Sequence, residues 1–503
     1  MIRGSGPGAH LMLVLTATMA VGPLLTHSLS AMSPLVIEDL ELTEAQFGLL
    51  ATTTFFVAAL AAVRTGRWAD RLSARALLLV MFVGAALAML LTAAAPGYAV
   101  LLLAMVVSGL GQVMANPATN RLIRLHVPAA RRASWLGVKQ AGVQASQLVA
   151  GLTFPALGLL LGWRIAVLVA VGVVLLLLVH GWWTVPENHS GAPAGRGSPG
   201  PHPTASASGS GSPTASASGS GSPTVSPAAS GSPSASPSGS ASGSGFPAAS
   251  GFPSASPSGS GSGSGSPSGF PSASGSPSAL PSGSASGSGS STASASPSRR
   301  GARRARAAGR PPMPGVVRAY AAAAALTGLG AQAANVYLPL YAHRELDLDV
   351  VAAGATVSVS ALVGIASRVL WARVMDRPGA DGFVLLAGMA LGAAASAVLL
   401  VLAPLHPGLA WAVWPAAVLH GGAALAVSVV VMSGAMRAVP AERVGASTGV
   451  VTMGLYGGFC AGPLVLGGLL QLTGSFAVGW TVVLACYLAC GALALVVRSR
   501  ARS

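Results

Sequence analysis

Several polar side chains lie inside apolar stretches that are long enough to cross a membrane, and these residues could do chemistry. Lys139, the only lysine among 503 residues, lies near the start of the stretch 134–160. Gln140, Gln144 and Gln147 follow it at helical spacing, so one face of this helix would be polar. An ionised group inside a bilayer costs about 2.5–3.5 kcal/mol on insertion scales and therefore indicates function. A lysine there could bind the negative charge of a solute.

Two interpretations of Lys139 stay open. In the first, the lysine contacts the substrate or takes part in gating. In the second, it lies only about two turns from the end of its helix, and its ammonium group reaches the lipid headgroups and anchors that helix. The equivalent position in the second half of the chain is the apolar Val451, so the scaffold that the halves share does not need a cation there.

Amides and histidines add candidates in other apolar stretches. Gln112, Asn116 and Asn120 share one face of the stretch 98–119. Amides in membrane helices often bond neighbouring helices, at about 0.6 kcal/mol each on average, but three on one face also suit a solute cavity. A histidine near mid-membrane either fills a packing position or titrates near neutral pH. The predicted substrate-binding candidates are Lys139, Gln140, Gln144, Gln112, Asn116, Gln332, Asn335, His27 and His420.

The acidic residues narrow the class of solute. Every Asp and Glu falls in a predicted loop or at the end of an apolar stretch. A carrier of cations usually needs a buried carboxylate, and many proton-coupled carriers titrate one, so cationic drugs are poor candidates. An anionic or neutral polar solute remains, coupled to protons through a histidine, to exchange, or to nothing.

The sequence lacks the residue patterns that enzymatic or metal chemistry would need. No nucleotide-binding loop, metal-ligand cluster or nucleophile–base set is present. The cysteines Cys460, Cys486 and Cys490 fall inside apolar stretches, where we expect them to act as small hydrophobic residues. We therefore expect neither an enzyme nor a bound cofactor or metal.

The composition is that of an integral membrane protein. Hydrophobic residues make up 52% of the chain and charged residues only 8%, whereas soluble domains carry roughly a quarter charged residues. The net charge of +16 comes from arginines that cluster between apolar stretches. This pattern follows the positive-inside rule and argues against nucleic acid as a partner, because nucleic-acid binders gather their charge on one soluble face.

Twelve apolar stretches form two sets of six on either side of a central segment, each near the roughly 20 residues that cross a hydrocarbon core. They lie near 11–37, 44–64, 76–95, 98–119, 134–160, 164–185, 316–342, 350–371, 383–403, 409–436, 446–471 and 476–497. Arginines gather in alternate loops, which predicts that both termini are cytoplasmic. The predicted fold is an all-α membrane protein with two pseudo-symmetric six-helix bundles, at residues 1–187 and 315–503.

Residues 188–314 form a predicted cytoplasmic linker. The segment consists mainly of Ser, Gly, Pro and Ala, so no apolar surface could offset the entropy lost on folding, and we expect disorder. It is either a plain spacer or a docking or phosphorylation segment. Its end, 299–310, carries six arginines that suit contact with anionic lipids of the cytoplasmic leaflet.

The two halves share an internal repeat. Val-Pro-Ala at 127–129, followed by Gly142, recurs as Val-Pro-Ala at 439–441, followed by Gly454, at one constant offset. Parallel repeats of this kind are typical of transporters, which bind their solute between the repeats near the middle of the membrane.

The chain resembles the major facilitator superfamily in everything except the linker. The family motif after the second helix is Gly-x-x-x-Asp-Arg/Lys-x-Gly-Arg/Lys-Arg/Lys, and this chain departs from it at Ser73 and Ala74. The resemblance implies that this loop latches the cytoplasmic ends of the halves together in the outward-facing state, with Asp70 bonded at a neighbouring helix end. The alternative is a solvated turn that only follows the positive-inside rule, which would explain the arginines but not Asp70. The residues assigned to this cytoplasmic gate, including a weaker copy in the second half, are Gly66, Asp70, Arg71, Arg75, Asp376 and Arg377.

Two motifs linked to proton coupling in this family are missing. Met105 and Ser108 stand where the fourth helix would carry Arg and Gln, and 134–160 lacks the Gly-Pro pattern of proton antiporters. The resemblance implies a monomeric secondary transporter in the plasma membrane that moves a small polar or anionic organic solute by rocking of its halves. An exporter of hydrophobic compounds, or a non-transporting sensor or scaffold, is the alternative.

Overall fold

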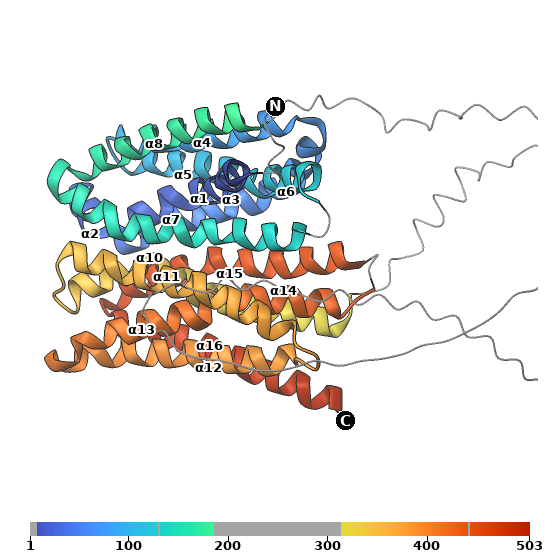
Figure 1. The fold of residues 1–503 in the computed structure, drawn as a ribbon. Helices are drawn as coiled ribbons and strands as arrows, with labels where there is room; N and C mark the ends of the chain where they lie inside the picture. Colours follow the sequence, from blue (N-terminus) through green and yellow to red (C-terminus); the bar gives the residue numbers. More distant parts are fainter. Residues whose placement is uncertain (1–7, 129–130, 186–312, 441–442, 503) are drawn as a thin grey trace, which may run out of the picture. The chain divides into compact units, whose positions relative to one another are not determined.

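The computed structural model describes residues 8–128, 131–185, 313–440 and 443–502, and within 63–71, 133–134 and 501–502 it describes the backbone alone. The described residues fold into helices and contain no strand (Figure 1). The predicted linker 188–314 lies outside the described residues except for its last two positions, and its basic tract 299–310 lies wholly outside them.

The helices of the first half agree with the six predicted spans. They are α1 (Ala9–Ala31), α2 (Ser33–Asp39), α3 (Glu44–Arg71), α4 (Ala74–Ala93), α5 (Tyr98–Gln112), α6 (Ala115–His126), α7 (Arg132–Leu161) and α8 (Trp163–Thr184). The second half has α10 (Gly315–Arg344), α11 (Val350–Met375), α12 (Gly382–Leu402), α13 (Val413–Leu419), α14 (Val427–Arg437), α15 (Val444–Thr473) and α16 (Phe476–Arg502).

Eleven segments of the described chain are long and apolar enough to cross a membrane. The twelfth predicted span, α10, is 30 residues long but is not one of the eleven. Polar residues, among them Gln332 and Asn335, lower its mean hydropathy, and its stretch 330–342 is buried throughout. α10 is therefore a central helix that faces protein on all sides at this level, so it does not need the apolar surface of a helix in contact with lipid.

The two ends of the bundle differ in charge. The end that carries 38–44 and 345–349 is called the acidic end here, and it lies to the left in Figure 1. The opposite end carries the ends of α6, α11 and α14, with Arg121, Arg124, Arg373, Arg377 and Arg437, and it is called the arginine-rich end.

The fourth span of each half is a broken helix, where the sequence predicted continuous spans at 98–119 and 409–436. In the first half, α5 ends at Gln112 and α6 begins at Ala115. Pro117 explains this break, since it has no N–H and its ring clashes with the carbonyl four residues before it. In the second half, a π-turn at His420–Ala424 separates α13 from α14, and such turns often mark functional sites.

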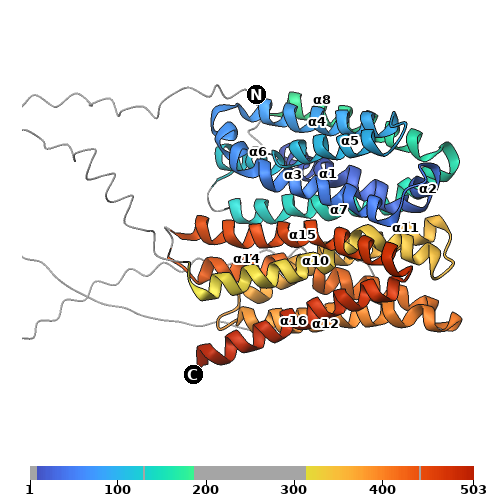
Figure 2. The ribbon, with the colours of Figure 1, turned by 180° about the vertical axis from the view of Figure 1, so that it is seen from behind.

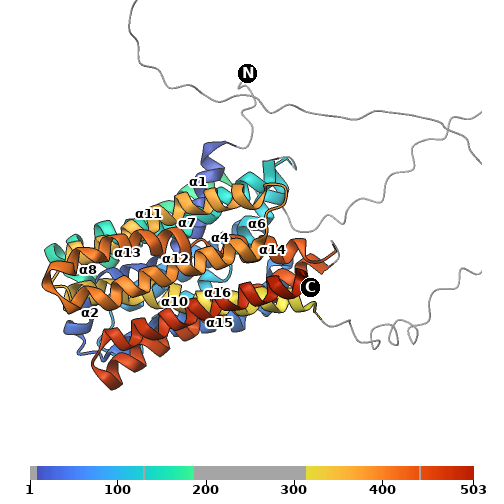
Figure 3. The ribbon, with the colours of Figure 1, turned by 90° about the horizontal axis from the view of Figure 1, so that it is seen from below.

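Glycines bring the central helix pairs into close contact. A Cβ atom at Gly454, Gly458 or Gly462 of α15 would lie 2.2 Å from a backbone carbonyl oxygen of α10. The repeat-related Gly142 of α7 lies equally close to α1, because a Cβ there would be 2.3 Å from the oxygen of Thr16. The sequence repeat is thus a repeat of packing, α1 with α7 and α10 with α15 (Figure 3).

The two six-helix halves meet through α3 with α15 and through α7 with α11. Thr52 of α3 donates to the Cys460 oxygen of α15 at 2.9 Å, and Ser358 of α11 donates to the Leu148 oxygen of α7 at 3.0 Å. Figure 2 shows the first half, in blue to green, beside the second half, in yellow to red. The two pairings are related by exchange of the halves, as the pseudo-symmetric fold requires.

The glycine contact predicts a position-specific effect on stability. Gly458→Ala would place a methyl group against the Ala325 oxygen and should lower the free energy of unfolding by about 1–3 kcal/mol, as overpacking does. Gly457→Ala is the matched control, since nothing lies within 4 Å of a Cβ at that position. Thermal unfolding in detergent should show a lower Tm for Gly458→Ala alone, and equal Tm values for both variants would contradict the close contact.

Candidate functional site

A cluster of buried polar side chains joins the two halves near the middle of the helices. Asn335 Oδ1 of α10 accepts from Gln147 Nε2 of α7 at 3.0 Å and from His420 Nε2 of the π-turn at 3.3 Å. Asn335 Nδ2 lies 3.4 Å from Gln332 Oε1. These four residues, all buried, are called the amide cluster. The four residues come from three segments that lie far apart in the sequence.

The amide cluster keeps hydrogen-bonding groups that the described protein atoms do not satisfy. Gln147 Oε1 and Gln332 Nε2 are buried without a partner, and so is Gln144 Oε1 one turn from Gln147. Buried polar atoms are nearly always paired in folded proteins. Acceptors and a donor that lack protein partners, gathered between the halves, are suited to a small polar solute or to water.

His27 and Ser30 of α1 line the edge of the amide cluster. Ser30 Oγ donates to the backbone oxygens of Asn335 and Val336 at 2.6 and 2.9 Å. His27 Nδ1 lies 2.9 Å from Ser146 Oγ, next to Gln147 in the chain. The structure therefore brings both predicted histidines to the region of the cluster, His420 within it and His27 beside it.

Lys139 belongs to a separate group of hydrogen-bonded polar side chains inside the first half. Its Nζ donates to Thr119 Oγ1 at 2.8 Å, Asn120 Oδ1 at 2.6 Å and Asn116 Oδ1 at 3.2 Å, so its three N–H groups all have protein acceptors. The side chain is buried, with 1% of its surface exposed. This lysine joins α7 to α6 just beyond the break in the fourth span.

The remaining predicted candidates lie around these two sites. Gln112 packs on α1, where a Cβ at Gly22 would lie 3.1 Å from its Cγ, and its Oε1 is buried without a partner. Gln140 is half-buried on α7, one turn from Gln144. The sequence found these positions from helical spacing, but it could not show which of them meet across the two halves.

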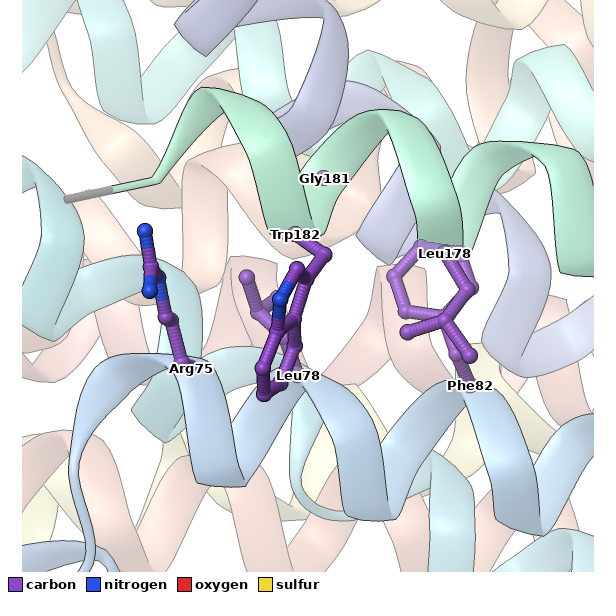
Figure 4. Close-up of a pocket in the computed structure, with 6 residues that line it drawn as sticks. All are labelled: Arg75, Leu78, Phe82, Leu178, Gly181 and Trp182. Carbon is purple, nitrogen blue, oxygen red and sulfur yellow. The ribbon is translucent and has the colours of Figure 1, made fainter. Parts of the chain in front are cut away.

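The predicted cytoplasmic gate is only partly visible. At Gly66, Asp70 and Arg71 the structure describes the backbone alone. Asp376 and Arg377 are exposed, just after the end of α11. Arg75 contacts α8 of its own half: Nε donates to the Val185 oxygen at 2.5 Å, and the guanidinium lies 5.5 Å from the Trp182 ring (Figure 4).

Sequence reasoning missed the role of two arginines on the fourth spans, one in each half. Arg121 of α6 donates to the Leu72 oxygen in the turn after α3, and Arg437 of α14 donates to the Met375 oxygen at the end of α11, at 2.6 Å. Each holds the turn that follows the second span of its half. Their shared position near the end of the fourth span was the signal in the sequence.

A further contact that sequence reasoning missed closes the acidic end. Tyr337 Oη of α10 donates to the Glu44 backbone oxygen at 2.6 Å, and Arg344 Nη1 pairs with Glu44 Oε1 at 2.5 Å. Gly48 and Gly467 leave room for the Tyr337 ring, because a Cβ on either would lie within 2.3 Å of its hydroxyl. The halves are therefore bonded to each other at this end.

The fold and its inter-repeat cluster define a multi-pass membrane protein of the transporter class. A family model described as Major Facilitator Superfamily matches residues 12–463, and the chain belongs to this family. A sequence search of curated proteins finds no significant match. In the part of the chain that is described, no group of three His, Cys, Asp or Glu side chains could hold a metal ion.

Two solved structures illustrate the fold. A bacterial homologue of the human lysosomal transporter Spinster, in an inward-facing and occupied conformation, is similar with a TM-score of 0.60 and 15% identity, over 98% of this chain and 97% of that chain. The nucleoside transporter NupG is similar with a TM-score of 0.60 and 12% identity, over 97% of this chain and 98% of that chain. At this identity the likeness shows the fold alone.

The Lys139 contact predicts a structural effect. Lys139→Met would leave the Thr119, Asn120 and Asn116 oxygens without their donor, which should lower the free energy of unfolding by about 1–3 kcal/mol. In a double-mutant cycle with Asn120→Leu, thermal unfolding in detergent should show coupling of at least about 0.5 kcal/mol. Unchanged stability combined with lost transport would instead make the ammonium group a solute contact.

Proposed function

We propose that this protein is a secondary transporter that moves a small polar or anionic organic solute by alternating access. The observation that carries the proposal is the amide cluster, which lies between the halves and has unpaired acceptors and a donor. In transporters built from repeats, the solute site lies at the repeat interface, where rocking of one half on the other exposes it to each side in turn. Gln147, Asn335, Gln332 and His420 would contact the solute, with Gln144 and His27 beside them.

The hydrogen bonds at the acidic end support a state that is closed to the outside. The positive-inside rule assigns the arginine-rich end to the cytoplasm and the acidic end to the outside, so both termini would be cytoplasmic. We take the membrane to be the plasma membrane. The halves are bonded at the acidic end through Tyr337, Glu44 and Arg344. A solute in the amide cluster would then reach the cytoplasm by the arginine-rich end.

The charges support a neutral or anionic solute. In the described spans, acidic side chains lie only at helix ends, so no carboxylate faces the amide cluster. Amides and imidazoles bind neutral polar groups by hydrogen bonds and leave a cation uncompensated.

The amide cluster can be tested by one substitution. Asn335→Ala removes the group that bonds both Gln147 and His420, so counterflow in proteoliposomes should fall at least about tenfold, which corresponds to about 1.4 kcal/mol. The assay uses a panel of labelled nucleosides, sugars and organic acids. Gln471→Ala is the control, because it removes an exposed amide from the acidic end of α15. Equal counterflow in parent and Asn335→Ala, with a solute that the parent moves, would place the site elsewhere.

Closure at the acidic end can be tested separately. Tyr337→Phe removes the bond to the Glu44 oxygen, worth about 0.5–1.5 kcal/mol, and should therefore populate the state in which this end is open. Amide hydrogen exchange in segment 44–52 should become faster. Arg498→Gln, which removes an ion pair with Asp381 inside the second half, is the control and should leave this segment unchanged. Unchanged exchange in Tyr337→Phe would mean that the tyrosine does not hold the halves together.

A further inference from the structure

We propose that Arg368 of α11 binds the carboxylate group of an organic anion. This inference deepens the proposed function and rests on it, because it names the class of solute that the inter-half site accepts. It assigns the counter-charge to an arginine near the cytoplasmic end of the predicted span 350–371, and not to Lys139.

Arg368 is a cation inside a membrane helix without a counter-ion among the described residues. Its Nη2 donates to the Leu425 oxygen at 3.1 Å, and its Nε is buried without a partner. A guanidinium group has five N–H donors. An unpaired charge in a membrane is costly, so such groups usually pair with a partner or mark a solute pathway.

The face of α11 that carries Arg368 points into the protein. Leu362, Ala366, Val369 and Leu370 are exposed and form the stripe of this helix that would contact lipid. At 100° per residue, Arg368 lies on the opposite side of the helix from this stripe. The exposed part of its half-buried side chain therefore opens between helices and not toward lipid tails.

The same face of α11 lies against the other half of the molecule. A Cβ at Gly364, one turn before Arg368, would lie 3.4 Å from Gln144 Cγ and 3.1 Å from Leu425 Cδ1. Arg368 is thus one turn from the level at which α7 and α11 meet. Its bond to Leu425 keeps the guanidinium near this level, whereas a snorkelling arginine would extend toward the arginine-rich end.

The neighbouring groups suit a carboxylate. Nε–H and the second N–H of Nη2 form the side of a guanidinium that binds a carboxylate through two parallel hydrogen bonds. Gln144, whose Oε1 is buried and unpaired, can present its amide group to the polar remainder of the solute. Lys139 cannot take this role without breaking its bonds, because three protein oxygens already occupy its N–H groups.

The binding test uses the full-length protein in detergent. Thermal unfolding is followed with benzoate, succinate and citrate, with their uncharged amides, and with chloride at equal ionic strength. We expect at least one carboxylate, and no amide, to raise the Tm of the parent and of Arg373→Met, which removes an exposed arginine of the same helix. Arg368→Met should bind that carboxylate at least about tenfold more weakly, and Arg368→Lys should fall in between because it keeps the charge but loses the paired bonds.

The Tm values of the ligand-free parent and Arg368→Met show whether Arg368 binds a ligand or stabilises the fold. Removing an unpaired buried cation should leave the Tm of Arg368→Met equal to or above that of the parent. A lower ligand-free Tm together with no carboxylate effect on the parent would make Arg368 a structural bond to Leu425 and overturn the proposal. Stabilisation that persists in Arg368→Met, or that only phosphatidylglycerol and no soluble carboxylate produces, would overturn it as well.

Counterflow in proteoliposomes distinguishes the two proposals. If the parent and Arg368→Met move a neutral solute equally and no carboxylate binds, the carboxylate site is wrong and the transporter proposal stands. If a carboxylate binds through Arg368 and the parent moves no solute, the carboxylate site stands and the transporter proposal is wrong.

Discussion

The structure depends on one constraint, namely that a polar group within the membrane must find its partner inside the protein. The chain meets this constraint in two ways. Inside the first half, Lys139 has an oxygen acceptor for each of its N–H groups. Between the halves, Gln147 donates a hydrogen bond to Asn335, but the Oε1 atom of Gln147 is buried without a partner. The first arrangement is complete and holds helices together, while the second is incomplete and is suited to a solute.

Close glycine packing makes this difference possible. Within each half, α1 with α7 and α10 with α15 approach until backbone meets backbone, and Gly142 and Gly454 occupy equivalent positions in the two pairs. Such pairs are held by many van der Waals contacts. Between the halves, the described hydrogen bonds each have a single side chain as donor, as with Thr52 and Ser358, which donate to backbone oxygens, and Gln147, which donates to Asn335. Breaking a few such bonds is compatible with rocking of two rigid halves.

Much of the fold could be predicted from sequence, because span length, arginine placement and the repeat are local properties of the chain. The polar stripe at Gln140, Gln144 and Gln147 was found in the same way, from helical spacing. Hydropathy could not show that the fourth spans are broken, since the breaks come from Pro117 and from a π-turn within otherwise apolar segments. Nor could it show that Asn335 is the acceptor shared by two other segments, because that depends on how the halves meet.

Arg368 shows why the charge of a residue is a weaker guide than its partners. By sequence, Lys139 stood out as the only lysine, whereas Arg368 was one arginine among many near a predicted cytoplasmic loop. Among the described residues, the lysine has three oxygen acceptors, whereas the guanidinium has one bond, to a backbone oxygen. A saturated cation contributes to the scaffold in every conformation that keeps its partners. In the proposed transporter, an unsaturated cation between the halves would be stabilised when an anion binds, and an anion that binds one conformation better would shift the population of the two states by that difference in affinity.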